Sequence, residues 1–207
     1  MSTKSGNLGM FTGIIEATGI IKEIAPAGNN LVFWVNSPLS RELKVDQSLS
    51  HNGVCLTVEE AGGDHYRVTA IAETLQKTNL GQWKPGTLIN LERCMQMNGR
   101  IDGHIVQGHV DTTATCTRAA EKGGSWEFEF TLDDHFASLI IEKGSITLNG
   151  ISLTIFNVGP NHFTVAIIPY TYTHTNMQQV VAGSQVNIEF DMIGKYVNRI
   201  AQLKANS

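Results

Sequence analysis

The sequence lacks the features that mark several large classes of protein. It has no run of lysine and arginine and a formal net charge of −4, which argues against nucleic acid as a partner, since phosphate binding needs a clustered positive surface. Its apolar stretches, such as VAIIP, are too short to span a bilayer. The three cysteines, Cys55, Cys94 and Cys116, are widely spaced and include no CxxC pair. They therefore indicate neither a disulfide framework nor a zinc site, and they fit a reducing cytoplasm.

The opening segment and the composition set the scale of the fold. Residues 1–9, MSTKSGNLG, are small and polar without an apolar core, which is typical of a tag remnant or a loose tail and not of a signal peptide. We expect the natural start at Met10. The 207 residues are 42% hydrophobic, which is enough for two small domains with real cores.

The chain contains an internal repeat. SLSHNGVCLTV from Ser48 falls on SITLNGISLTI from Ser145 at an offset of 97 (145 − 48), and the register continues without a gap for about forty-five residues. Upstream, FTGIIEATG from Phe11 resembles VQGHVDTTA from Val106 at an offset of 95 (106 − 11). The two-residue difference is expected in or near the AGNN and EKGGSW loops. Two copies of one domain suggest two matching pockets.

The composition of the segments and the spacing of the turn signals between them favour a β fold. Segments such as LVFWVNS and HYRVTAI are rich in β-branched and aromatic residues, and turn signals such as AGGD and KPG separate them. Such spacing favours barrels or sandwiches. Short helices are predicted near 38–43 and 73–79 and at their repeat partners near 133–141 and 169–176. We expect domains at 10–96 and 97–187, followed by a helix in 188–207.

The predicted C-terminal helix has no counterpart in the repeat. Ile193, Val197, Ile200 and Leu203 form an apolar stripe at helical spacing. A short amphipathic helix is marginal alone. It could pack on its own barrel, or against copies of itself in an oligomer, and the second interpretation is favoured because the repeat does not include it.

Residues with a role in a reaction are expected at positions where the two copies of the repeat differ. Cys55 corresponds to Ser152, Ile14 to His109, and His51 to Leu148. A thiol in one pocket and a hydroxyl in the other would make two sites inequivalent, and an imidazole in one half could exchange protons near neutral pH. Structural interpretations remain open, since a strand cysteine is usually a small core residue and the NG pairs mark tight turns with positive φ. The residues alone predict a two-domain β protein with paired pockets and do not name the ligand.

An ordered set of motifs resembles the riboflavin synthase alpha-chain family: MFTGIIEATG, NGVCLTV, ETLQKTNLG, NLER, GHIVQGHVD, NGISLTI and NIEFDMIGKY. The resemblance covers Met10 to about Arg199. It implies an all-β fold of two tandem six-stranded Greek-key closed barrels and a C-terminal helix that bundles in a homotrimer. It also implies that two molecules of 6,7-dimethyl-8-ribityllumazine react by four-carbon transfer to give riboflavin and 5-amino-6-ribitylamino-pyrimidinedione. The site would lie between subunits and need no metal, flavin or nicotinamide cofactor.

The resemblance also implies the site residues. The first pocket would use Gly13, Ile14, Ile15, Cys55, Leu56, Thr57, Thr69, Ala70, Ile71, Ala72, Glu73 and Thr74. The second would use Gly108, His109, Val110, Lys143, Ser152, Leu153, Thr154, Ala166, Ile167, Ile168, Pro169, Tyr170 and Thr171. Phe11 would close the pocket.

Six of the implied residues are assigned catalytic roles. His109 would move the acidic proton of the C7 methyl group, with Ser48 and Cys55 on the same wall. Ser152 and Thr154 would orient the opposite ring or activate the water or hydroxyl that adds at C7, and Asp191 would assist proton transfer. Cys55 is expected as a polar wall residue or base and not as a nucleophile, because a thiolate needs a positive neighbour.

Two departures and two alternatives accompany this prediction. Asn149 stands where many relatives carry aspartate, and Gln107 where serine is common. The main alternative is a non-catalytic antenna protein that binds lumazine or flavin. A flavin-binding reductase would need a nucleotide-binding unit, for which no GxGxxG stretch is present.

Overall fold

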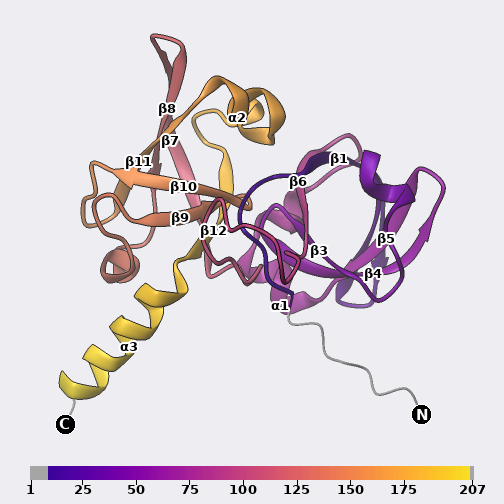
Figure 1. The fold of residues 1–207 in the computed structure, drawn as a ribbon, viewed down its shortest axis with the longest axis horizontal. Coiled ribbons are helices and arrows are strands. Elements are labelled where there is room, and N and C mark those ends of the chain that lie inside the picture. The colour runs from indigo at the N-terminus through magenta and orange to yellow at the C-terminus, as the bar shows by residue number, and fades with distance from the viewer. Residues whose placement is uncertain (1–8, 206–207) are drawn as a thin grey trace.

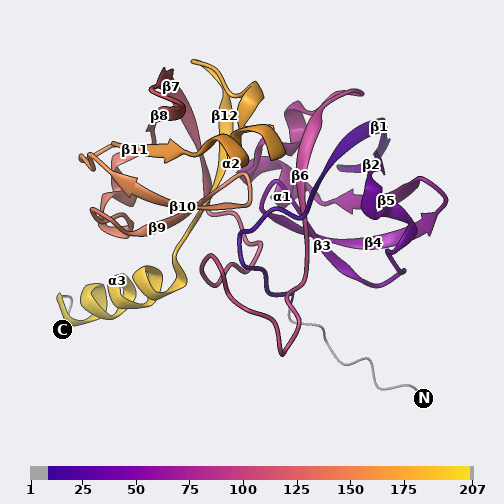
Figure 2. The same cartoon turned by 45° about the horizontal axis from the view of Figure 1, so that its top comes forward.

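The computed structural model describes residues 9–205, so the tail predicted for residues 1–9 lies, apart from Gly9, outside the described residues. Two closed, six-stranded antiparallel barrels stand side by side, and a C-terminal helix extends away from the second barrel (Figure 1; Figure 2). This arrangement confirms the predicted fold class. Within residues 9–205, no helix has the length and apolar character needed to cross a membrane.

The first barrel contains six strands: β1 (Ala17–Ala27), β2 (Asn30–Asn36), β3 (Ser48–His51), β4 (Val54–Gly62), β5 (His65–Ala70) and β6 (Leu88–Arg93). They follow the order β1-β2-β5-β4-β3-β6 around the barrel. Three short helical segments connect them: η1 (Pro38–Arg41), α1 (Ala72–Lys77) and η2 (Asn79–Gln82). Because β2 continues into β3 on the other side of the β4–β5 pair, the connection is of the Greek-key type.

The second barrel repeats the first element by element. Its strands are β7 (Thr112–Lys122), β8 (Ser125–Thr131), β9 (Ser145–Leu148), β10 (Ile151–Phe156), β11 (His162–Ile167) and β12 (Gln185–Phe190). Its helical segments are η3 (Asp134–Leu139), α2 (Pro169–His174), η4 (Asn176–Gln179) and the C-terminal α3 (Met192–Ala205).

The element bounds locate the change of repeat offset. β1 and β2 map onto β7 and β8 at an offset of 95, whereas β3 to β6 map onto β9 to β12 at 97. The two extra residues therefore lie between β8 and β9, around η3. We predicted the difference in or near the AGNN and EKGGSW loops. The hairpins themselves have equally long turns, so the difference lies one connection further along the chain.

Alternation along the strands puts apolar side chains inside each barrel and polar ones outside. In β3 and β4, Leu49, Leu56 and Val58 are buried in the first core, and the register pairs Ser48 with Thr57 and Ser50 with Cys55 on the opposite face. In β9 and β10, Ser145 pairs with Thr154 and Thr147 with Ser152. Both barrels thus present a hydroxyl-rich patch on the outer face of equivalent hairpins.

Six buried asparagines join the barrels about a pseudo-twofold axis. This asparagine cluster consists of Asn52, Asn79, Asn90, Asn149, Asn176 and Asn187. The Asn79 backbone N–H donates to Asn187 Oδ1 at 2.7 Å, and the Asn176 N–H donates to Asn90 Oδ1 at 2.8 Å. The amides of Asn90 and Asn187 each donate, at 2.9 Å, to the backbone carbonyl of an NG-turn asparagine of the other barrel. Each barrel therefore satisfies buried polar groups of its partner.

The two NG turns meet at this axis. Asn52 and Asn149 have φ of 47° and 45°, and the following Gly53 and Gly150 have φ of 80° and 82°, which confirms the predicted tight turns. A Cβ on either glycine would come within 2.9 Å of the other's backbone nitrogen. Asn149 therefore belongs to the barrel interface.

Helix α3 keeps its apolar stripe exposed. Ile193, Val197, Ile200 and Leu203 are between 52% and 67% exposed, and so is Tyr196. Packing of the whole stripe on its own barrel, one of the two interpretations above, does not occur within this chain. Packing against other copies stays a prediction.

Candidate functional site

Two backbone segments cross between the barrels, the first strap (residues 11–16) and the second strap (residues 106–111). They pair antiparallel, with the Phe11 N–H donating to the Val106 carbonyl at 2.7 Å and the Val106 N–H donating back at 3.0 Å. Phe11 is fully buried at this crossing.

Each strap lies on the barrel of the other repeat. The Gly13 carbonyl accepts from the Ser152 N–H, and the Gly108 carbonyl accepts from the Cys55 N–H, both at 2.8 Å. The sequence analysis grouped Gly13, Ile14 and Ile15 with Cys55, and Gly108, His109 and Val110 with Ser152. That grouping was wrong, because the straps exchange barrels before they reach the hairpins.

Buried carboxylates fix the straps to β6 and β12. Glu92 accepts from the Thr12 N–H and hydroxyl, both at 2.7 Å, and from the Gly13 N–H at 3.0 Å. Glu189 accepts from the Gln107 N–H at 2.7 Å and the His109 N–H at 2.9 Å. Burial raises the pKa of both carboxyl groups, against the effect of these hydrogen bonds. The sequence analysis assigned neither glutamate to the site, although they are repeat partners.

The first wall is the outer patch formed by Ser48, Cys55, Thr57, Thr69 and Ile71. The register pairs Val58 with Val68, both buried in the core, so by alternation the neighbouring Thr57 and Thr69 lie on the outer face. Ile71 is 54% exposed, so the patch combines three hydroxyls, a thiol and an apolar surface at its edge. His109, whose side chain is exposed, directly follows Gly108, the strap residue that lies on Cys55 of this wall.

The Cys55 thiol is held in its neutral form. Burial raises its pKa, while a hydrogen bond with the Ser48 side chain acts in the opposite direction, and the nearby Cys94 and Glu189 raise it further. Cys94 donates to the Ser48 carbonyl at 3.4 Å. Because no cation is among the groups that shift this pKa, the surroundings suit a polar wall residue better than a nucleophile.

The second wall is the equivalent patch of Ser145, Ser152, Thr154, Ala166 and Ile168. Ile168 is 61% exposed, like its partner Ile71, and the first strap brings Gly13 against Ser152. The predicted residues Leu56, Ala70 and Ile167 are buried in the cores, so they offer backbone groups to a ligand and not side chains. Ala72, Glu73 and Thr74 lie on α1, and Pro169, Tyr170 and Thr171 on α2.

His104 is a site residue that the sequence analysis missed. Its Nδ1 lies 2.7 Å from Ser152 Oγ and its Nε2 lies 3.2 Å from Thr147 Oγ1. Burial lowers its pKa, although the charge of Asp191 acts in the opposite direction, so the imidazole is neutral at pH 7 with one donor and one acceptor nitrogen. Its partner at the 95-residue offset is Gly9, which packs against Cys55 Sγ. Extending the offset two residues upstream of Phe11 would have revealed this difference.

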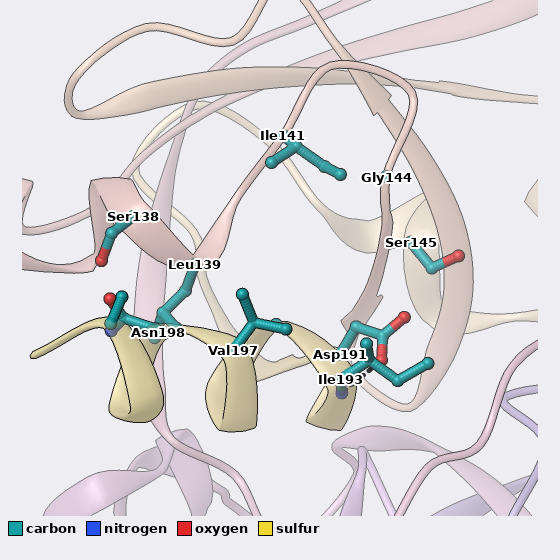
Figure 3. Close-up of a pocket in the computed structure, with 11 residues that line it drawn as sticks. Ser138, Leu139, Ile141, Gly144, Ser145, Asp191, Ile193, Val197 and Asn198 are labelled. Atoms are coloured by element: carbon teal, nitrogen blue, oxygen red, sulfur yellow. Dashed lines mark hydrogen bonds between the residues drawn. The ribbon is translucent and has the colours of Figure 1, made fainter. Parts of the chain in front are cut away.

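Asp191 and Lys143 lie at the margin of the second wall. Asp191 Oδ1 accepts from the Ile193 N–H at 2.9 Å and so caps α3. It also lines, with Ser145, a cavity of about 450 Å³ between α3 and the second barrel (Figure 3). Lys143 Nζ lies over the Phe156 ring, 5.2 Å from its centroid. Among the described residues, no group of three or more His, Cys, Asp or Glu side chains is placed to hold a metal ion.

Comparisons with known proteins agree with this geometry. A family model described as the lumazine binding domain matches twice, at residues 12–94 and 107–191. The riboflavin synthase of Bacillus subtilis (strain 168) is 40% identical over 95% of this chain and 92% of its own length. The riboflavin synthase of Schizosaccharomyces pombe is 37% identical over 93% of this chain and 94% of its own length.

A solved structure shares the fold. LumP in complex with 6,7-dimethyl-8-(1'-D-ribityl) lumazine superposes with a TM-score of 0.79 at 22% identity, over 87% of this chain and 98% of LumP. LumP complexed with riboflavin superposes equally well. The doubled match to the lumazine binding domain and the identity to these synthases over nearly the whole chain place this chain in the riboflavin synthase family.

Proposed function

We propose that the protein is a riboflavin synthase, a transferase that converts two molecules of 6,7-dimethyl-8-ribityllumazine into riboflavin and 5-amino-6-ribitylamino-pyrimidinedione. The observation that carries this proposal is the pair of equivalent walls with different chemistry. The reaction uses two identical heterocycles, one as donor and one as acceptor of a four-carbon unit. Two related walls, one with Cys55 and one with Ser152 and His104, suit this combination of likeness and asymmetry.

The site is completed between subunits of a homotrimer. The walls lie on the outer faces of two separate barrels, so a wall of a neighbouring copy can supply the facing half. The exposed stripe of α3 is suited to bundle with its copies. Holding two rings stacked makes their encounter effectively unimolecular, which can contribute about 7–11 kcal/mol to lowering the barrier. The free cysteines fit a cytoplasmic enzyme.

The two imidazoles take different roles. His109, exposed beside the first wall, is suited to exchange the proton of the C7 methyl group. His104 is suited to accept the proton of the Ser152 hydroxyl through Nδ1 while its Nε2–H donates to Thr147, which would make Ser152 a better nucleophile or base. Thr57 and Thr154 offer hydroxyls to the ribityl chains.

The alternative is a lumazine carrier without turnover. The fold match to LumP, whose structures contain lumazine, riboflavin or flavin mononucleotide, keeps this alternative open. We favour the enzyme because both walls retain their polar groups and identity to the synthases is higher. The test is to mix the protein with 6,7-dimethyl-8-ribityllumazine in buffer with EDTA and follow riboflavin absorbance and fluorescence. One riboflavin for every two lumazines consumed supports the synthase, and bound lumazine without riboflavin supports the carrier.

Replacing His109 by alanine is expected to lower kcat by about 100- to 10,000-fold, the usual contribution of a general acid–base. Lumazine affinity should change little, because the Glu189 bond is made by the backbone of residue 109. Turnover and lumazine fluorescence titration measure the two effects. His65→Ala, which removes an imidazole from the β4–β5 pairing outside both walls, is the control. An equal loss of binding and turnover would leave His109 a binding role alone.

A further inference from the structure

The end of the second strap is tied to helix α3. The Asp111 N–H donates to the Ile188 carbonyl at 2.8 Å, and its carboxylate accepts from the Phe190 N–H at 2.9 Å. Lys195, in the first turns of α3, donates to both oxygens of this carboxylate at 3.0 and 2.9 Å. The two side chains are 23% and 27% exposed, so this pair is partly shielded from water.

The first strap ends in the same way, with a different source of positive charge. Glu16 is the repeat partner of Asp111, and its N–H donates to the Leu91 carbonyl at 3.0 Å. Arg93, the partner of Phe190, donates to Glu16 from its backbone N–H at 3.3 Å and from Nε at 2.9 and 3.0 Å. One residue of β6 thus supplies both the amide and the cation. In the second barrel, phenylalanine supplies the amide alone, and the helix supplies the cation.

Asp111, the carboxylate that Lys195 holds, lies two residues along the strap from His109. His109 is held on one side by its N–H on Glu189 and on the other by Asp111. Removing Lys195 would leave the half-buried Asp111 carboxylate without its charged partner, and a carboxylate in that state turns toward water. The backbone bond from Asp111 to the Ile188 carbonyl would remain, so the strap between Glu189 and Asp111 would be held less firmly at this end.

We infer that Lys195 is a positioning residue, which holds the second strap through Asp111 and thereby sets the place of His109 beside the first wall. The part of this inference that concerns turnover rests on the proposed function. The part that concerns the strap does not. The side chain of Lys195 donates to Asp111, and its charge opposes the rise that burial causes in the pKa of Glu189. Its effect on chemistry therefore passes through the two carboxylates that hold the second strap.

The test compares Lys195→Met, Lys195→Arg and Lys204→Met. The last is a matched control, because Lys204 is an exposed lysine near the end of the same helix. Hydrogen exchange by mass spectrometry follows the amides of residues 105–111 and of α3, native mass gives the oligomeric state, and riboflavin formation gives kcat and KM. Asp111→Asn and its combination with Lys195→Met complete a double-mutant cycle.

We expect Lys195→Met to speed exchange in the second strap and to lower kcat, each by about tenfold, since small displacements of a reacting group cost at least that much. KM and native mass should change little, Lys195→Arg should restore both readouts, and the double variant should be no worse than either single one. Unchanged strap exchange, or faster exchange confined to α3, would overturn the inference. A wild-type protein that forms no riboflavin would sink the proposed function, while strap exchange would still decide the role of Lys195.

Discussion

Gly108→Ala is expected to lower riboflavin formation by at least about 100-fold, because it forces the second strap off the first wall. Gly108 has a φ of +76°, and an added Cβ would lie 2.7 Å from Cys55 Cβ and 2.8 Å from the buried Phe11 ring. Neither neighbour is the free end of a flexible side chain. The strap must move, and the bond from the Cys55 N–H to the Gly108 carbonyl must break. Steady-state turnover and lumazine titration measure the result.

Gly123→Ala separates this clash from backbone strain. Gly123 has a similar φ of +59° in the β7–β8 turn, and an added Cβ would meet nothing within 4 Å. We expect it to cost about 1 kcal/mol of stability and to leave turnover intact. If Gly108→Ala behaves like Gly123→Ala, the contact between strap and wall is not part of the site.

The second large effect concerns a buried polar pair in the first barrel. His51 is fully buried, with Nδ1 donating to the Leu49 carbonyl at 2.9 Å and Nε2 accepting from the Tyr66 hydroxyl at 2.9 Å. The carbonyl fixes this neutral tautomer, because it can only accept. Burial lowers the pKa of His51 to about 4. The second barrel has Leu148 and Phe163 at the equivalent positions, both also fully buried.

We expect the first barrel to lose stability as the pH falls. The double variant His51→Leu/Tyr66→Phe should remove that loss. Because the folded pKa lies below the unfolded value of about 6.5, the penalty is absent above that pH. It grows as pH falls toward 4, where it reaches about 3 kcal/mol, since the unfolded chain takes up a proton that the folded one does not. Denaturant unfolding at several pH values from 7 to 4 measures this slope.

The single variants test the pairing. His51→Leu strands the buried Tyr66 hydroxyl and should cost about 1–3 kcal/mol at pH 7, whereas the double variant, which installs the apolar pair of the second barrel, should recover most of that loss. An acid slope in the double variant as steep as in the wild type would mean that other groups set the acid stability.

The repeat made most of the fold predictable. Alternating strand segments, NG turns and the gap-free register indicate two copies of one barrel. Two segments with the same apolar alternation and the same turns pair their strands in the same register and so form the same closed sheet. The exchange of the straps was not predictable from these patterns. An offset says which residues are equivalent, but Gly13 and Gly108 would be equivalent whichever barrel each one touched.

The missed and misplaced site residues have separate physical causes. His104 lies two residues before the segment that was compared between the copies, and its partner is Gly9, so a comparison that begins at Phe11 does not include it. Glu92 and Glu189 have the same role in both repeats, so they do not stand out among the positions at which the two copies differ. Asn149, which stands where many relatives carry aspartate, has a structural contact that the sequence did not reveal: its side chain accepts from the Asn187 N–H at 2.9 Å within the asparagine cluster.

The asparagine cluster limits how the two halves of this duplicated chain can drift apart. A replacement that removes a donor or acceptor at one of these six positions leaves a group of the other copy without its partner. We expect such a replacement to need a compensating change across the axis. No such reciprocity links Cys55 to Ser152 or Gly9 to His104. Two identical ancestral halves could therefore acquire different residues on the two walls by single substitutions, while the asparagine contacts between the barrels were retained.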